Sequence, residues 1–132
     1  MSNKKLGNSF EAEFCETLAE EGFWTHNLAQ NSAGQPADVI AVKNGDAYLI
    51  DCKVCSRGRF SFDRIEANQV LSMELWRDCC NGEGWFALDF SGEVYMVTLY
   101  SMWNCKNRHA SMTKELAAAY GIPLGEWLWV RR

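Results

Sequence analysis

The chain has 132 residues and a formal net charge of −4 at pH 7; 48% of its residues are hydrophobic and 23% are charged. This length and apolar content predict a single globular domain over residues 1–132 and exclude a disordered chain. No apolar run is long enough to span a bilayer or to form a secretory signal, so we expect no membrane association. The six cysteines are then expected to be reduced thiols, which predicts a cytoplasmic protein.

The first part of the chain predicts a helix followed by strands. Asn8 or Ser9 is expected to cap a helix whose apolar residues recur at spacings of three and four, and Gly22 ends it. Strands are expected at residues 23–28, 37–43 and 46–54, with a polar loop at 29–36. Asn44-Gly45 separates the last two strands and predicts a two-residue hairpin turn, because both positions of such a turn need positive φ.

The second part of the chain predicts helices that alternate with a further hairpin. We expect a basic loop at residues 56–61, a helix at 63–80, strands at 85–90 and 93–100, and a helix at 113–120. Trp127 and Trp129, at strand spacing in the tail, are expected to pack in a core or at a dimer surface. The whole order predicts an α/β (α+β) fold with a central mixed sheet of about five strands flanked by helices.

The predicted hairpin places two acidic residues opposite each other. With a two-residue turn the numbers of paired residues sum to 89, so Asp38 lies opposite Asp51. Side chains at such positions are about 5 Å apart, and like charges there are destabilising unless a cation lies between them. Alternation along the strand brings Lys53 to the face of Asp51, and Glu11 of the first helix is expected to reach the same face. This grouping predicts a site for a hard divalent cation.

The same residues resemble the PD-(D/E)XK nuclease superfamily, and within it the Holliday junction resolvases of the Hjc and RecU types. The matching positions are Gly7, Glu11, Asn31-Ser32-Ala33-Gly34, Pro36-Ala37-Asp38, Asp51-Cys52-Lys53, Gln69 and Tyr120-Gly121-Ile122-Pro123-Leu124-Gly125. These positions follow the order of the family pattern, and they span most of the chain. The resemblance implies a restriction-endonuclease-like core and a metal-dependent DNA endonuclease that acts on branched DNA in recombination or phage-type DNA processing.

The resemblance also implies a role for each residue of the site. Glu11, Asp38 and Asp51 would be metal ligands, together with the backbone carbonyl of Cys52. Lys53 would be the catalytic lysine that orients the attacking water, and Gln69 would assist near the metal or the DNA. The implied cofactor is Mg²⁺, with Mn²⁺ as an alternative and no small-molecule cofactor, and the implied assembly is a homodimer that cuts a four-way junction symmetrically.

Several further residues are candidates for DNA contacts because cationic and hydroxyl side chains bind backbone phosphates. They are Lys4, Lys5, Ser32, Arg57, Arg59 and Arg64. Arg131 and Arg132 are open between a phosphate contact and a solubilising surface.

Two other functions are compatible with the pattern. One is a restriction-like or repair endonuclease that cuts duplex DNA. The other is a non-catalytic DNA-binding protein that keeps the nuclease fold, because Asp51 stands where the resolvases usually carry Glu. Metal-dependent cleavage of branched and linear DNA discriminates among these functions.

Overall fold

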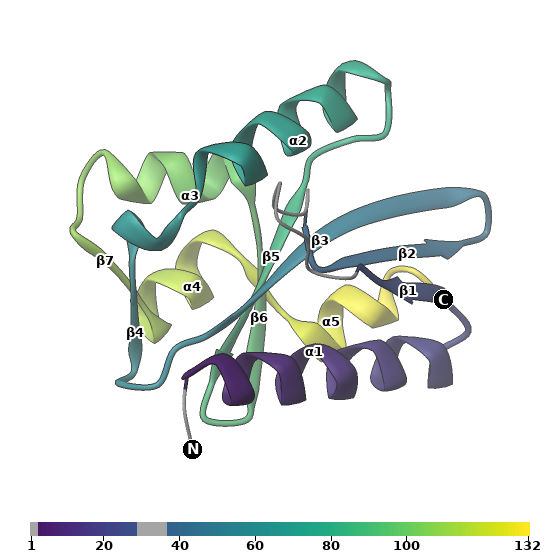
Figure 1. Ribbon diagram of the computed structural model, residues 1–132, viewed down its shortest axis with the longest axis horizontal. Coiled ribbons are helices and arrows are strands. Elements are labelled where there is room, and N and C mark those ends of the chain that lie inside the picture. The colour runs from purple at the N-terminus through teal and green to yellow at the C-terminus, as the bar shows by residue number, and fades with distance from the viewer. Residues whose placement is uncertain (1–2, 29–36) are drawn as a thin grey trace.

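The computed structural model describes residues 3–28 and 37–132, with side chains from residue 9 onward within those ranges (Figure 1). The helices are α1 (Asn3–Glu20), the 3-10 helix η1 (Phe62–Arg64), α2 (Ala67–Asp78), α3 (Leu99–Lys106), α4 (Lys114–Tyr120) and α5 (Leu124–Trp129). The strands are β1 (Trp24–Asn27), β2 (Val39–Lys43), β3 (Asp46–Val54), β4 (Arg59–Ser61), β5 (Trp85–Phe90), β6 (Glu93–Thr98), β7 (Ser111–Thr113) and β8 (Ile122–Pro123).

Within the described residues, six strands form a mixed sheet in the order β1-β2-β3-β5-β6-β8. The pairing of β3 with β5 is parallel and the other pairings are antiparallel. Strands β4 and β7 pair separately in a small antiparallel sheet. The predicted mixed α/β fold is confirmed, with one short edge strand more than the five expected.

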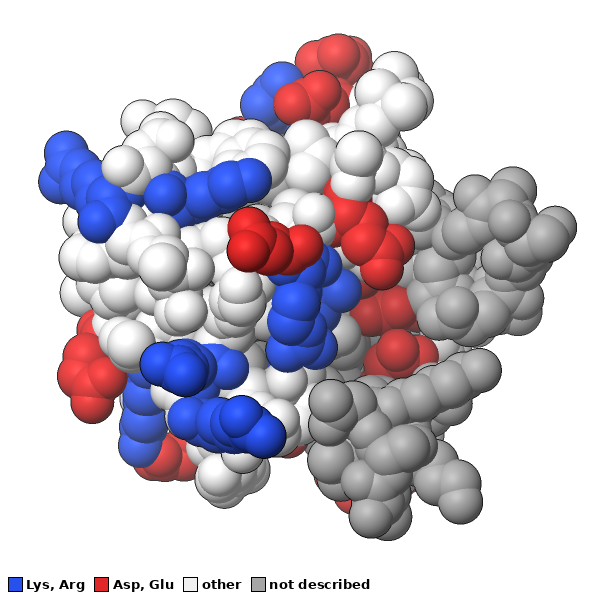
Figure 2. Space-filling view, turned by 60° about the vertical axis from the view of Figure 1, so that its left-hand side comes forward, with Lys and Arg blue, Asp and Glu red and all other residues white. Residues whose placement is uncertain are grey.

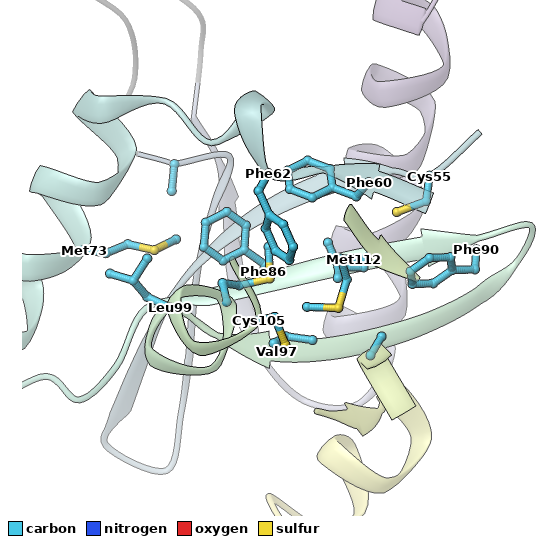
Figure 3. Packing of buried hydrophobic residues seen from close by; sticks show 14 of the residues in the cluster. Cys55, Phe60, Phe62, Met73, Phe86, Phe90, Val97, Leu99, Cys105 and Met112 are labelled. Carbon is cyan, nitrogen blue, oxygen red and sulfur yellow. The ribbon is translucent and has the colours of Figure 1, made fainter. Parts of the chain in front are cut away.

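Helices cover both faces of the main sheet. One buried cluster joins α1 and α5 to the sheet, with Phe14 and Trp127 among its members. The cluster on the other face joins α2, α3 and α4 to the sheet, with Met73, Phe86 and Leu99 among its members (Figure 3). Successive residues of a strand point to opposite faces, so a side chain of β3 faces either α1 or α2. This alternation decides which helix supplies a partner to each residue of the hairpin.

The first helix extends further toward the N-terminus than the sequence predicted. Helix α1 begins at Asn3, so Asn8 and Ser9 lie inside the helix and neither is its cap. The early turns contain Lys4 and Lys5, which favour helix, and no proline, so the helix extends past the polar residues that suggested a cap. The strand predicted at 23–28 is confirmed as β1, in a shorter form.

The second half of the chain contains elements that the sequence did not predict. The loop at 56–61 includes β4, which pairs with the unpredicted β7. The helix predicted at 63–80 is divided into η1 and α2, and the strand predicted to end at residue 100 stops at Thr98, whose hydroxyl caps α3 by accepting a hydrogen bond from Ser101 N. The tail is helix α5, which buries Trp127 and leaves Trp129 62% exposed.

No helix in the part of the chain that the structure describes has the length and apolar character needed to cross a membrane.

Candidate active site

The pairing of β2 with β3 has the predicted register. Val39 pairs with Ile50, and the hairpin continues to Lys43 opposite Asp46 around the Asn44-Gly45 turn. Asp38 lies one residue before β2, and its N–H still donates to Ile50 O at 3.1 Å. The ladder therefore brings Asp38 to the level of Asp51, as expected.

The carboxylate of Asp38 is held by the backbone of the neighbouring strand. Cys52 N donates a hydrogen bond to Asp38 Oδ2 at 2.7 Å, and Asp38 is only 5% exposed. A charge-assisted bond of this length fixes the carboxylate in one orientation. The observed contact uses the Cys52 N–H, whereas metal ligation by the Cys52 carbonyl stays a prediction.

Asp51 is fully buried between two polar partners. Gln69 Nε2, from α2, donates to Asp51 Oδ1 at 2.9 Å, and Lys53 Nζ lies 3.1 Å from Asp51 Oδ2. The Lys53 side chain keeps 12% of its surface exposed, whereas Asp51 has none. Lys53 thus connects the buried carboxylate to the surface. The structure brings Lys53 and Gln69 to Asp51, as the sequence pattern led us to expect.

Glu11 joins this group from the other side of the sheet. Helix α1 packs on the face of Ile50 and Cys52, opposite to the face on which Asp51 points, yet Glu11 lies close enough to Asp38 and Lys53 for both charges to shift its pKa. Glu11 shares a hydrogen bond with Asp38, the residue just before β2 begins. The carboxylates of Glu11, Asp38 and Asp51 thereby come together at this end of the hairpin.

The electrostatic consequence is an excess of negative charge in a poorly solvated place. Burial, the charge of Asp38 and a hydrogen bond to it raise the pKa of Glu11 from 4.5 to about 7, against a smaller opposing effect of Lys53. Burial and then Asp38 also raise the pKa of Asp51 well above its ordinary value, while Lys53 acts in the opposite direction. One ammonium does not balance the carboxylates, so an additional cation would be stabilised here.

The donors fit a hard divalent cation. The candidate ligands are carboxylate oxygens, which Mg²⁺ prefers, and buried Asp51 Oδ2 is held by the ion pair with Lys53 Nζ at 3.1 Å without a well-aligned hydrogen bond from a described residue. As they stand, no three His, Cys, Asp or Glu side chains among the described residues form a ready metal-binding group. Lys53 lies against Asp51 instead, so metal binding requires a local rearrangement of these side chains.

The candidate DNA-binding residues differ in their surroundings. Arg57 and Arg59 are exposed where the chain enters β4. Figure 2 looks onto the side that carries β4 and β7 and shows Lys and Arg side chains spread over it. Arg64 is more constrained, because Arg64 Nη1 donates to Val54 O at 3.2 Å and the guanidinium lies 5.0 Å from the centre of the Phe60 ring. This fastening of η1 to the end of β3 has no signal in the sequence pattern.

Three of the predicted contacts fall outside the described part of the site. Ser32 lies in the undescribed segment, and for Lys4 and Lys5 only the backbone of α1 is described.

Comparisons with known proteins agree with the fold and identify a family. The family model of the archaeal Holliday junction resolvase (Hjc) matches residues 2–131. A crossover junction endodeoxyribonuclease Hjc from Methanocaldococcus jannaschii is 25% identical over 93 residues, which are 70% of this chain and 65% of that protein. The structure of Hjc from Archaeoglobus fulgidus, a Holliday junction resolvase, superposes with a TM-score of 0.72 at 16% identity over 92% of this chain and 99% of that one. The aligned part therefore spans less than two thirds of the curated relative's length, and the solved structure supports the fold.

The raised pKa of Glu11 predicts how stability depends on pH and metal. Between pH 4.5 and about 7 the folded protein keeps a proton that the unfolded chain has lost, so in EDTA stability falls as pH rises through this window. We expect Mg²⁺ to raise the melting temperature clearly at pH 8 and only weakly at pH 5.5, where protons compete for the carboxylates. Differential scanning calorimetry of the wild type and Glu11→Gln measures both effects. An equal shift at the two pH values, or the same shift in Glu11→Gln, contradicts this assignment of the ligands.

Proposed function

Because the chain belongs to the archaeal Holliday junction resolvase (Hjc) family, we propose that its single domain is a Mg²⁺-dependent endonuclease that cuts four-way DNA junctions. The observation that carries the proposal is the β2–β3 register, which holds Asp38 beside Asp51. Lys53 forms an ion pair with the Asp51 carboxylate. Phosphodiester hydrolysis needs a bound cation, an oriented water and a charge that offsets the phosphate, and these residues can provide for all three.

Asp38, Asp51 and Glu11 are the residues that would hold the metal. Glu11 belongs to α1, Asp51 to β3, and Asp38 directly precedes β2, where the Cys52 N–H fixes it at 2.7 Å. When bound, Mg²⁺ would lower the pKa of a water and offset negative charge on the phosphate. The shorter side chain of Asp51, in place of the Glu usual in the family, is supported from α2 by the hydrogen bond from Gln69 Nε2. Gln69 is therefore a positioning residue for the carboxylate.

Lys53 would act on the substrate side of the site. Its ammonium lies 3.1 Å from Asp51 Oδ2, and part of its side chain reaches solvent. In the DNA complex it would orient the attacking water and stabilise the charge that develops on the phosphate. For this role the Lys53 ammonium would have to leave its present ion pair with Asp51.

Arg57 and Arg59 are proposed to bind backbone phosphates near the cut. Both are exposed at the start of β4, which follows the strand that carries Asp51 and Lys53. Arg64 connects η1 to β3 through its hydrogen bond to Val54 O, and its side chain is otherwise exposed to solvent. Contacts of this kind give affinity without sequence preference, as a junction-selective enzyme requires.

We propose that the protein is a homodimer that uses the outer side of α2. Leu71 and Leu75 lie one turn apart on this helix and are 58% and 56% exposed. Leu75 and Trp76 also line an apolar groove of about 340 Å³ between α2 and the β2–β3 hairpin. A second copy of the chain would cover this apolar surface and would place two sites to cut two strands of one junction.

We also propose a cytoplasmic location. It is supported by the six cysteines, all of them free thiols, and by a DNA substrate.

Cleavage of a labelled four-way junction, beside linear duplex of the same sequence, tests the proposed activity. We expect paired nicks in the junction with Mg²⁺ and none with EDTA. Lys53→Ala should lower the rate about 100- to 10,000-fold and Asp51→Asn should abolish cutting, while both variants still bind the junction in EDTA. Lys106→Ala and Asp78→Asn, which change exposed residues outside the proposed site, serve as matched controls and should cut normally.

Each of the other functions has its own outcome in this assay. Equal cutting of junction and duplex would keep the nuclease site and exclude the junction preference. Binding without cutting under Mg²⁺ and Mn²⁺ would make this protein a non-catalytic member of the fold.

Sedimentation velocity tests the proposed dimer. The wild type is expected to sediment as a dimer at micromolar concentration and Leu75→Glu as a monomer, because a charge in an apolar interface is strongly disfavoured. Tyr100→Glu, which replaces a side chain that is 66% exposed on α3, should remain dimeric. A monomeric wild type, or a dimer that tolerates Leu75→Glu, would contradict this interface.

A further inference from the structure

A second polar surface lies at the far end of the hairpin from the carboxylates. The Asn44-Gly45 turn and the residues that follow α5 enclose an open pocket of about 400 Å³. Its polar lining comes from Lys43, Asn44, Asp46, Tyr48, Arg131 and Arg132. Figure 1 shows the C-terminal end beside β1 at this end of the sheet. The proposed active site uses none of these side chains.

The charge of this pocket favours an anion. Lys43, Arg131 and Arg132 contribute three positive charges to its lining, and Asp46 contributes one negative charge. The chain as a whole carries a net charge of −4, so the local positive excess runs against the overall composition. Guanidinium groups offer several N–H donors in a plane that matches the oxygens of a phosphate.

Arg131 is held in place by the aromatic core beneath the pocket. Its guanidinium carbon lies 4.1 Å from the centre of the Trp127 ring and 5.1 and 5.3 Å from those of Tyr48 and Trp85. Nη1 donates to Trp127 O at 3.0 Å, while the buried Nε–H donates to no partner among the described residues. The arginine is thus ordered before any ligand binds and retains unused donors.

The two other cations are also restrained. Arg132 stacks on the exposed ring of Trp129, with 3.1 Å between the guanidinium carbon and the ring centre. Lys43 Nζ donates to Glu21 O at 2.7 Å and lies 5.2 Å from the centre of the Phe23 ring. Restrained cations lose less side-chain entropy on binding than free surface lysines and arginines do. This distinguishes the pocket from an ordinary solvated charge cluster.

We propose that this pocket binds a backbone phosphate of the DNA substrate, on an arm away from the point of cleavage. Asp46 precedes Asp51 by five residues of β3, which corresponds to about 17 Å. Phosphates of one strand repeat about every 3.4 Å along the helix axis, so this separation equals about five base pairs. A four-way junction presents several arms around its centre, and a linear duplex presents fewer backbones at this distance. The inference rests on the proposed function, since it assumes a DNA substrate.

Fluorescence anisotropy with a labelled four-way junction in EDTA tests the pocket. Arg132→Ala removes an exposed cation and leaves the Arg131 contacts intact, so the fold is retained. We expect the dissociation constant to rise about threefold to tenfold for Arg132→Ala and further for Arg132→Glu. The slope of log affinity against log salt should become shallower by about one for Arg132→Ala. Lys43→Gln gives a second, independent removal of charge, and Arg77→Ala is the matched control on α2, expected to bind as the wild type does.

An NMR signal from a residue of the pocket tests this proposal separately from the proposed function. The ¹H–¹⁵N signal of Arg131 Nε should shift when the junction is added, in the wild type and in Lys53→Ala alike. Normal junction binding and cutting by the wild type, with unchanged affinity in Arg132→Glu and no shift at Arg131, would overturn the pocket and leave the nuclease proposal intact. A shift with inorganic phosphate alone, and none with DNA, would assign the pocket to a free anion and overturn the DNA contact. A wild type that does not bind the junction would overturn both proposals.

Discussion

The antiparallel pairing of β2 with β3 is the constraint on which the site depends. A two-residue turn fixes the register, and the register leaves Asp38 and Asp51 next to each other in a buried place. Burial, and after it the charge of Asp38, raises the pKa of Glu11 and of Asp51. A cation bound among these carboxylates would offset their mutual repulsion.

The layers of the fold supply the partners that this arrangement needs. Helix α2 provides Gln69 to one oxygen of Asp51, and α1 on the opposite face provides Glu11 at the point where β2 begins. The backbone of β3 holds Asp38 through the Cys52 N–H. Because the partners come from both faces, the site forms only after the sheet and its two helical layers have packed. Lys53, from the same strand as Asp51, then links the buried carboxylate to the surface where DNA would bind.

The hairpin register and the grouping of Asp38, Asp51 and Lys53 could be predicted from sequence because they follow from a local turn and a period of two. The resemblance to the Hjc family, which the family model confirms, points to Gln69, while Glu11 is expected from the first helix; the approach of both side chains depends on packing. The face from which Glu11 arrives could not be predicted, since no local pattern encodes it. The pairing of β4 with β7 is also non-local. Trp127 packs in the core as expected, but the spacing of two suggests a strand, whereas the tail is helix α5 and leaves Trp129 exposed.

The most direct test of the account is a crystal structure with Mn²⁺, in which anomalous scattering locates the ion. We predict one site at the oxygens of Asp38, Asp51 and Glu11, with Lys53 no longer against Asp51, and no ion at this place in crystals of Asp38→Asn. An ion bound elsewhere in the wild type, or a site that persists in Asp38→Asn with Lys53 still paired to Asp51, would contradict the central claim that the hairpin register builds a metal site.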